Sequence, residues 1–203
     1  MVGKYFYPYL MDQPFKFTKY DKYFDDFVMQ MEAFVPRPEI ELEEVPAPQK
    51  LAPRAYAVVG DVALDENDDV ATGRFVLLLD PEGQEAWDGN FRCVTFVRAA
   101  IDSEMASDPM LAEVGWTWFL ESLAKAGADF RSPSGTVTRV ASKSFGQLVG
   151  TDDDSEIEIR ASWTPTEPSQ LMFHAKAWME LLAVTSGLAP LPEGVSSLGQ
   201  NRR

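Results

Sequence analysis

The strongest constraint on the fold is a pair of β-prone runs joined by a connection rich in turn residues. Residues 75–79 are all apolar, which is typical of a strand buried on both of its faces. Strands are expected over 73–79 and 91–98. Between them, Asp80-Pro81-Glu82-Gly83 places Pro and Gly at favoured turn positions, and Asp88-Gly89 is a further hairpin dipeptide. We therefore expect the chain to be organised around this β-hairpin.

The remaining elements follow from hydrophobic periodicity and from Gly and Pro punctuation. The other expected strands are 55–64, 136–145 and 156–163, with a weaker strand, suited to a sheet edge, over 39–45. The expected helices begin at Tyr20 and end before Pro36, run over 110–126, and run from about 168 to 186. The second helix carries apolar residues almost all round and should be well buried. The order helix, weak strand, three strands, helix, two strands, helix predicts an α+β fold with a mostly antiparallel sheet and helices packed on it.

The length of 203 residues is right for one domain with a substantial core. The first 23 residues are aromatic-rich and interrupted by Pro8 and Pro14, so an irregular N-terminal extension is expected over 1–23. A single α+β domain is expected over 24–198, followed by a short tail over 199–203.

Charge and cysteine content exclude several classes of function. The formal net charge of −14 disfavours binding to nucleic acid and to anionic membrane surfaces, because both require a basic face. The single cysteine, Cys93, permits neither an intrachain disulfide nor a thiolate metal cluster. The sequence has no secretory signal and no apolar run of transmembrane length, so a soluble, cytoplasmic protein is expected.

The common catalytic and cofactor motifs are missing. The sequence has no Gly-rich phosphate loop, no dinucleotide fingerprint, no nucleophile elbow and no H-E-x-x-H. Asp65, Asn67 and Asp69 have the opening spacing of a calcium loop, but valines stand where that loop needs Gly and Glu. The only histidine, His174, is expected at the margin of a helical apolar stripe, and Cys93 is expected to be an inert thiol in mid-strand. We predict no metal, no cofactor and no catalytic residue.

The turn-rich connection is nevertheless a candidate site. Paired carboxylates can perform acid–base chemistry when burial separates their pKa values. Four carboxylates crowd around Trp87 there: Asp80, Glu82, Glu85 and Asp88. With an arginine from the adjoining strand, the candidate ligand-binding residues are Trp87, Glu85, Asp88 and Arg92. The simpler interpretation is a solvated hairpin tip in which Trp87 packs on a neighbour.

Arginines on the predicted strands offer a second candidate. If they share one sheet face they could form an anion-binding patch, against the global charge. The alternative, which we prefer, is cross-strand pairing with Glu156 and Glu158. The residues concerned are Arg74, Arg92, Arg98, Arg139 and Arg160.

Long stretches of the chain carry a resemblance to a known family. They are RPEIELEEVPAPQKLAP (37–53), ATGRFVLLLDPEGQEAWDGNFRCVTFVRA (71–99), EMASDPMLAEVGWTWF (104–119), SGTVTRVASKSFG (134–146), EIRASWTP (158–165) and AWMELLAVTSGLAPLPEGV (177–195). From about Phe24 to Leu198 the chain resembles the domain of unknown function 3000 family of actinobacteria. The resemblance implies a cytoplasmic actinobacterial protein, and it carries no established activity, substrate, cofactor or functional residue.

A second resemblance concerns only the order of elements. The order is similar to that of the type III secretion chaperone-like fold, whose members are small, acidic, dimeric and bind extended peptide segments. Fold order alone does not fix function, so this similarity is an analogy.

Two hypotheses about function follow. The first is a non-enzymatic binding or adaptor protein that acts through protein–protein contacts, as a homodimer or with another partner. It rests in part on apolar residues on the back face of the last helix, because an exposed apolar face marks an interface: Phe173, Ala177 and Val184. The second is a small-ligand binder or enzyme that uses the acidic hairpin around Trp87.

Overall fold

The computed structural model describes residues 17–65, 68–148 and 155–190. Its strands are β1 (Ile40–Glu44), β2 (Arg54–Asp65), β3 (Asp68–Gln84), β4 (Gly89–Ala100), β5 (Phe130–Ala141) and β6 (Ser155–Pro165). Its helices are α1 (Lys19–Glu32), α2 (Ser103–Ser107), α3 (Leu111–Lys125) and α4 (Leu171–Thr185), with 3-10 turns η1 (Glu85–Trp87), η2 (Gly146–Leu148) and η3 (Pro168–Gln170). The predicted α+β class and order of elements are confirmed. The short helix α2 was not predicted.

All six strands form one antiparallel sheet in the order β1-β2-β3-β4-β6-β5. The first four strands pair with their neighbours in the sequence. The last strand, β6, lies between β4 and β5, so β5 becomes the outermost strand at one side. The weak strand β1 forms the other edge, as predicted.

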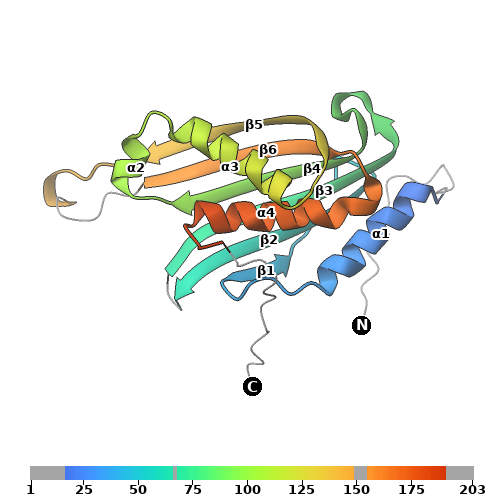
Figure 1. The fold of residues 1–203 in the computed structure, drawn as a ribbon, viewed down its shortest axis with the longest axis horizontal. Helices are drawn as coiled ribbons and strands as arrows, with labels where there is room; N and C mark the ends of the chain where they lie inside the picture. Colours follow the sequence, from blue (N-terminus) through green and yellow to red (C-terminus); the bar gives the residue numbers. More distant parts are fainter. Residues whose placement is uncertain (1–16, 66–67, 149–154, 191–203) are drawn as a thin grey trace, which may run out of the picture.

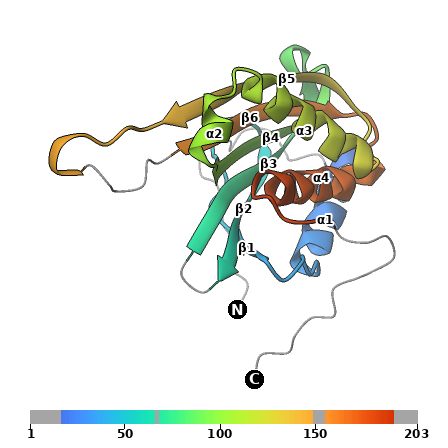
Figure 2. The ribbon, with the colours of Figure 1, turned by 60° about the vertical axis from the view of Figure 1, so that its left-hand side comes forward.

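The helices cover one face of this sheet (Figures 1 and 2). Helix α4 lies between α1 and α3 and contacts β2, β3, β4 and β6. We call the helix-covered side the inner face and the opposite side the outer face. Along β3, Phe75, Leu77 and Leu79 point into the inner core, whereas Val76 and Leu78 belong to a small cluster on the outer face. All five are buried, as the apolar run predicted.

A pair of glycines lets α4 approach the sheet closely. Gly60 on β2 lies opposite Gly73 on β3. A Cβ atom at Gly60 would lie 2.9 Å from Cη2 of Trp178, and one at Gly73 would lie 3.1 Å from Nε1 of the same indole. The Trp178 ring therefore lies over a floor made of two glycine backbones.

The central hairpin turns later than predicted. Asp80–Gly83 is a bulge in β3, since Leu79 pairs with Phe91 and the next pair is Gln84 with Gly89. The amide of Asn90 replaces the missing ladder bonds by donating to the backbone oxygens of Asp80 and Pro81, at 3.2 and 3.0 Å. The chain reverses over Glu85–Asp88, where Asp88 adopts a left-handed φ of 55°.

Burial of the helices also differs from the sequence-based expectation. Helix α3 buries one side, and Val114 remains 39% exposed, because the helix packs mainly against α4 and the β5–β6 part of the sheet. Helix α4 is buried nearly all round because it is flanked by two helices. No helix among the described residues is both long and apolar enough to cross a membrane.

Candidate functional site

The outer face of the sheet is the main candidate, because none of the described helices covers it (Figure 2). Near β2 and β3 it is padded by the connector that precedes β2, whose Val45, Ala47 and Ala52 pack against the outer cluster of Ala57, Val76 and Leu78. Towards β4, β6 and β5 the same face is hollowed. A shallow, open groove of about 500 Å³ runs there across four strands.

Strand register explains which side chains line this groove. One row across the sheet is Arg74 on β3, Phe96 on β4, Arg160 on β6 and Thr136 on β5. The next row is Val76, Val94, Ser162 and Ser134, in the same order of strands. The groove therefore has an apolar floor of two valines and a phenylalanine, arginines on both sides of that phenylalanine, and hydroxyls towards β5.

The two groove arginines are held differently. Arg74 donates from Nη2 to the backbone oxygen of Pro46 at 2.8 Å, and no carboxylate pairs with it among the described residues. The guanidinium of Arg160 lies 5.1 Å from the centre of the Phe96 ring, and its Nη1 lies 2.7 Å from Glu158 Oε2. An anionic group in the groove would meet one arginine without a carboxylate partner and one that already has a partner.

The arginines on the strands were expected either to form an anion-binding patch on one sheet face or to pair with glutamates across strands. Each interpretation describes part of the outer face. Alternation puts Arg74, Arg92, Arg98 and Arg160 on the outer face. Arg139 lies on the inner face, where its Nη1 donates to the backbone oxygen of Asp108. Pairing with glutamate is also present, since Arg98 Nε lies 3.5 Å from Glu156 Oε1.

Arg92, one of the predicted ligand-binding residues, is 6% exposed. Its guanidinium donates to the backbone oxygens of Ser132 and Ser162 and to the hydroxyls of Ser134, Ser162 and Thr164, at 2.7–3.2 Å. Burial lowers its pKa from the ordinary value. Arg92 thus ties β4 to β6 and to the start of β5, and its hydrogen bonds go to neutral acceptors.

The acidic hairpin places its side chains mostly towards solvent. Glu85 and Asp88 are exposed, and Asp88 pairs with Arg131, whose Nε lies 3.2 Å from Oδ2. Trp87 is half-buried against the outer cluster, and its backbone oxygen accepts a hydrogen bond from the Thr164 hydroxyl, which also binds Arg92. The structure therefore brings Trp87 and Arg92 together through Thr164. Glu85 and Asp88 do not join them, and none of the three hairpin residues lines the groove.

The only histidine and the only cysteine are core residues. His174 is fully buried, and its Nδ1 accepts a hydrogen bond of 2.9 Å from the indole Nε1 of Trp163. Burial lowers the pKa of His174 to about 4 and raises that of the Cys93 thiol well above its ordinary value. Within the described ranges, no group of three His, Cys, Asp or Glu side chains could hold a metal ion. Asn67 of the calcium-like spacing lies outside the described residues.

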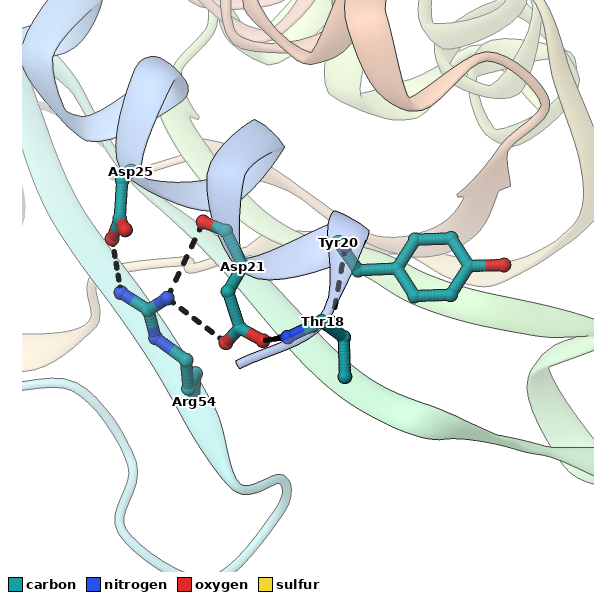
Figure 3. Close-up of polar contacts among 5 residues, drawn as sticks. All are labelled: Thr18, Tyr20, Asp21, Asp25 and Arg54. Atoms are coloured by element: carbon teal, nitrogen blue, oxygen red, sulfur yellow. Dashed lines mark hydrogen bonds and ion pairs between the residues drawn. The ribbon is translucent and has the colours of Figure 1, made fainter. Parts of the chain in front are cut away.

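A buried ion pair attaches α1 to the sheet (Figure 3). Thr18 caps the helix, and its backbone N–H and hydroxyl each donate to Asp21 Oδ2 at 2.7 Å. Arg54 at the start of β2 lies 3.1 Å from Asp21 Oδ1 and also pairs with Asp25. Burial acts to raise the pKa of Asp21, but the hydrogen bonds from Thr18 and Arg54 and the charge of Arg54 hold it below the ordinary value. This cluster is a structural clamp.

The predicted interface on α4 loses most of its exposed surface. Ala177 is 2% exposed and Val184 packs against the core, because α4 is enclosed by α1 and α3. Only Phe173 of the three remains exposed, at 37%. An apolar back face of α4 therefore no longer supports the first hypothesis.

Fold and groove together define a two-layer α+β protein whose antiparallel sheet carries helices on one face and an open groove on the other. A model of the family described as "Protein of unknown function (DUF3000)" matches residues 20–196. The chain belongs to this family, in agreement with the resemblance seen in the sequence. No curated protein and no solved structure matches the chain.

Proposed function

We propose that this protein is a non-enzymatic binding or adaptor protein that holds a segment of a partner protein on the outer face of its sheet. The observation that carries the proposal is the groove with an apolar floor and arginines at its sides. Sheet faces that lack a helical layer are covered by solvent or by a partner, and apolar area on such a face favours a partner.

The chemistry of the groove indicates what it would bind. Val76, Val94 and Phe96 suit an apolar side chain, while Arg74 and Arg160 suit a carboxylate next to it. The hydroxyls of Ser134, Thr136 and Ser162 can donate hydrogen bonds to the carbonyl oxygens of a peptide backbone or accept them from its N–H groups. A partner segment with an apolar residue beside an acidic one fits this arrangement.

Photo-crosslinking in cells of the native host tests this proposal. A benzophenone amino acid replaces Phe96 in the groove, and in a control chain it replaces the half-buried Trp118 on α3, in the other layer. The expected result is a discrete protein adduct from the groove position and none from the control. The same chain with Arg74→Glu and Arg160→Glu should lose that adduct. Identical adducts from both positions, or an adduct that survives the arginine changes, would contradict the proposal.

The second hypothesis has a separate signature. A small molecule retained in the native mass spectrum, lost on Trp87→Ala and kept on Arg74→Glu, would favour the hairpin site over the groove. Since Trp87 packs on the outer cluster, a Trp87→Phe control keeps the packing and tests the indole alone.

A further inference from the structure

The free edge of β5 is a second interaction surface, next to the groove that β5 partly lines. We infer that it pairs, antiparallel, with the β5 edge of a second copy of this chain, so that two sheets join into one. The evidence lies in the pairing of β5, in the direction of its backbone groups, and in the distribution of charge.

The β5 edge is long and unpaired. Strand β5 has 12 residues and pairs only with β6 among the described strands. Residues 131–136 and 138–141 are exposed, and Val137 is half-buried. Helices α2 and α3 contact β5 and belong to the helical layer on the inner face (Figure 1). Pro133 and a bulge between Arg131 and Ser134 protect the start of the strand, whereas residues 134–141 pair with β6 in regular register. A regular, open edge of this length is a template for pairing with another strand.

The register shows which backbone groups face outwards. Hydrogen bonds in an antiparallel ladder alternate in direction along a strand. Ile101 N–H donates to Ser155 O, so the odd-numbered residues of β6 bond towards β4 and the even-numbered residues bond towards β5. Thr136 and Thr138 pair with even-numbered residues of β6 and therefore bond to β6. It follows that Gly135, Val137 and Arg139 direct their N–H and C=O groups to the free edge.

These outward groups are self-complementary. In an antiparallel pair centred on Val137, each Gly135 lies opposite Arg139 of the second copy, and the three bonded pairs form about six hydrogen bonds. The glycine leaves room for the arginine and keeps the two Arg139 side chains apart. On the outer face, Thr136 then lies opposite Thr138 of the second copy, a favourable cross-strand pair.

Charge also favours this edge for self-association. Each chain carries −14, so two copies repel one another over most of their surface. Residues 130–151 form the longest stretch without Asp or Glu, and repulsion is smallest there. Nearby Glu156 and Glu158 are paired with Arg98 and Arg160. The opposite edge, β1, carries Glu41, Glu43 and Glu44, which protect it against pairing.

Complementary charges at the exposed Thr136 and Thr138 test the inference by sedimentation velocity. One variant carries Thr136→Glu and Thr138→Glu, and a second carries Thr136→Lys and Thr138→Lys. We expect the unaltered protein to sediment as a dimer, each variant alone as a monomer, and the equimolar mixture as a dimer. Circular dichroism and thermal unfolding of each variant check that the fold is kept.

A control variant changes the charge by the same amount elsewhere. Gln30→Glu on α1 and Thr117→Glu on α3 are exposed and lie in the helix layer. This chain should remain a dimer. An unaltered protein that is monomeric at all concentrations, or a Thr136→Glu, Thr138→Glu variant that dimerises as the unaltered chain does, would overturn the inference. Thr136 also lines the groove, but the crosslinking at Phe96 is read in a chain with unaltered β5 and the edge is read by oligomeric state, so the groove and the edge can fail separately.

Discussion

The indole nitrogen of Trp163 donates a hydrogen bond of 2.9 Å to Nδ1 of His174 inside the core. This bond fixes the imidazole as the tautomer with its proton on Nε2, since Nδ1 is the acceptor. Within the described part of the chain, that Nε2 finds no hydrogen-bond partner. The histidine is therefore held neutral, and protonating it would place a charge in the core.

The buried histidine should make the protein sensitive to mildly acidic pH. The pKa of His174 is lowered to about 4 from an ordinary value of 6.5. Between these pH values the unfolded chain binds a proton at this histidine and the folded chain does not. The stabilising contribution of the neutral His174 is therefore fully present above pH 6.5 and is lost as the pH drops towards 4. The loss is on the order of 3 kcal/mol. Urea unfolding across this range, compared with His174→Gln, measures it.

The glutamine variant supplies the control for this window. Its amide oxygen can still accept from Trp163, but it does not titrate. The slope of stability against pH should therefore be shallower in the variant. Equal slopes in the two proteins would show that His174 is not the group responsible.

The buried ion pair between Asp21 and Arg54 should contribute more to the stability of the fold than the partly exposed pair between Asp25 and Arg54. Asp21 is fully buried, whereas the Asp25 side chain is 45% exposed, and both bind the same arginine. We expect Asp21→Asn to cost about 3 kcal/mol, and Asp25→Asn less than about 1 kcal/mol. Thermal or chemical unfolding at neutral pH compares them directly.

The same clamp adds a second, lower pH window. The pKa of Asp21 in the folded chain lies below its ordinary value of 3.8. Its contribution is therefore present above that value and is lost as the pH falls through the lower folded pKa. Asp21→Asn should remove this part of the acid response and leave the His174 window unchanged.

The glycine floor under Trp178 should not tolerate a methyl group equally at its two positions. A Cβ at Gly73 would lie 3.0 Å from the backbone oxygen of Phe96, which cannot move without shifting β4. At Gly60 the close atoms belong to side chains of Trp178, Leu182 and Leu42. Both alanine substitutions should destabilise by about 1–3 kcal/mol, with Gly73→Ala the worse. An equal or reversed order of unfolding midpoints would contradict this packing.

The thiol of Cys93 should be unreactive in the folded protein. Its side chain is fully buried and burial raises its pKa, so little thiolate forms and reagents cannot reach it. A disulfide reagent should label no thiol in the native chain over minutes and one thiol per chain in denaturant. Fast native labelling would show that the β4 region opens far more often than its burial implies.

Local pattern was enough to predict most elements of this fold. The apolar run at 75–79 and the alternation over 156–163 gave strands with the correct sides buried. The burial of each helix was harder to predict, because it depends on which other elements pack against that helix in the folded chain. The apolar residues of α3 run round the helix, yet Val114 faces solvent, whereas Ala177 on α4 is covered by flanking helices.

The groove could not be predicted, because it depends on long-range strand order. Arg74 and Arg160 flank Phe96 only because β6 inserts beside β4. If β5 instead of β6 lay beside β4, Thr136 and its neighbours would take the place of Arg160 next to Phe96. The burial of Arg92 likewise depends on the segment at Ser132–Ser134 folding over it, and nothing in the residues around position 92 signals that.

The position of β6 also sets the order in which the sheet can be completed during synthesis. The strands β1 to β4 pair in sequence and can form as the chain emerges from the ribosome. Strand β5 emerges next, but its only described sheet partner is β6, which is made later. A nascent chain that ends before Ser155 therefore leaves β4 with an open edge and β5 without a neighbour. The C-terminal segment, β6 followed by α4, completes the sheet and its helical layer together.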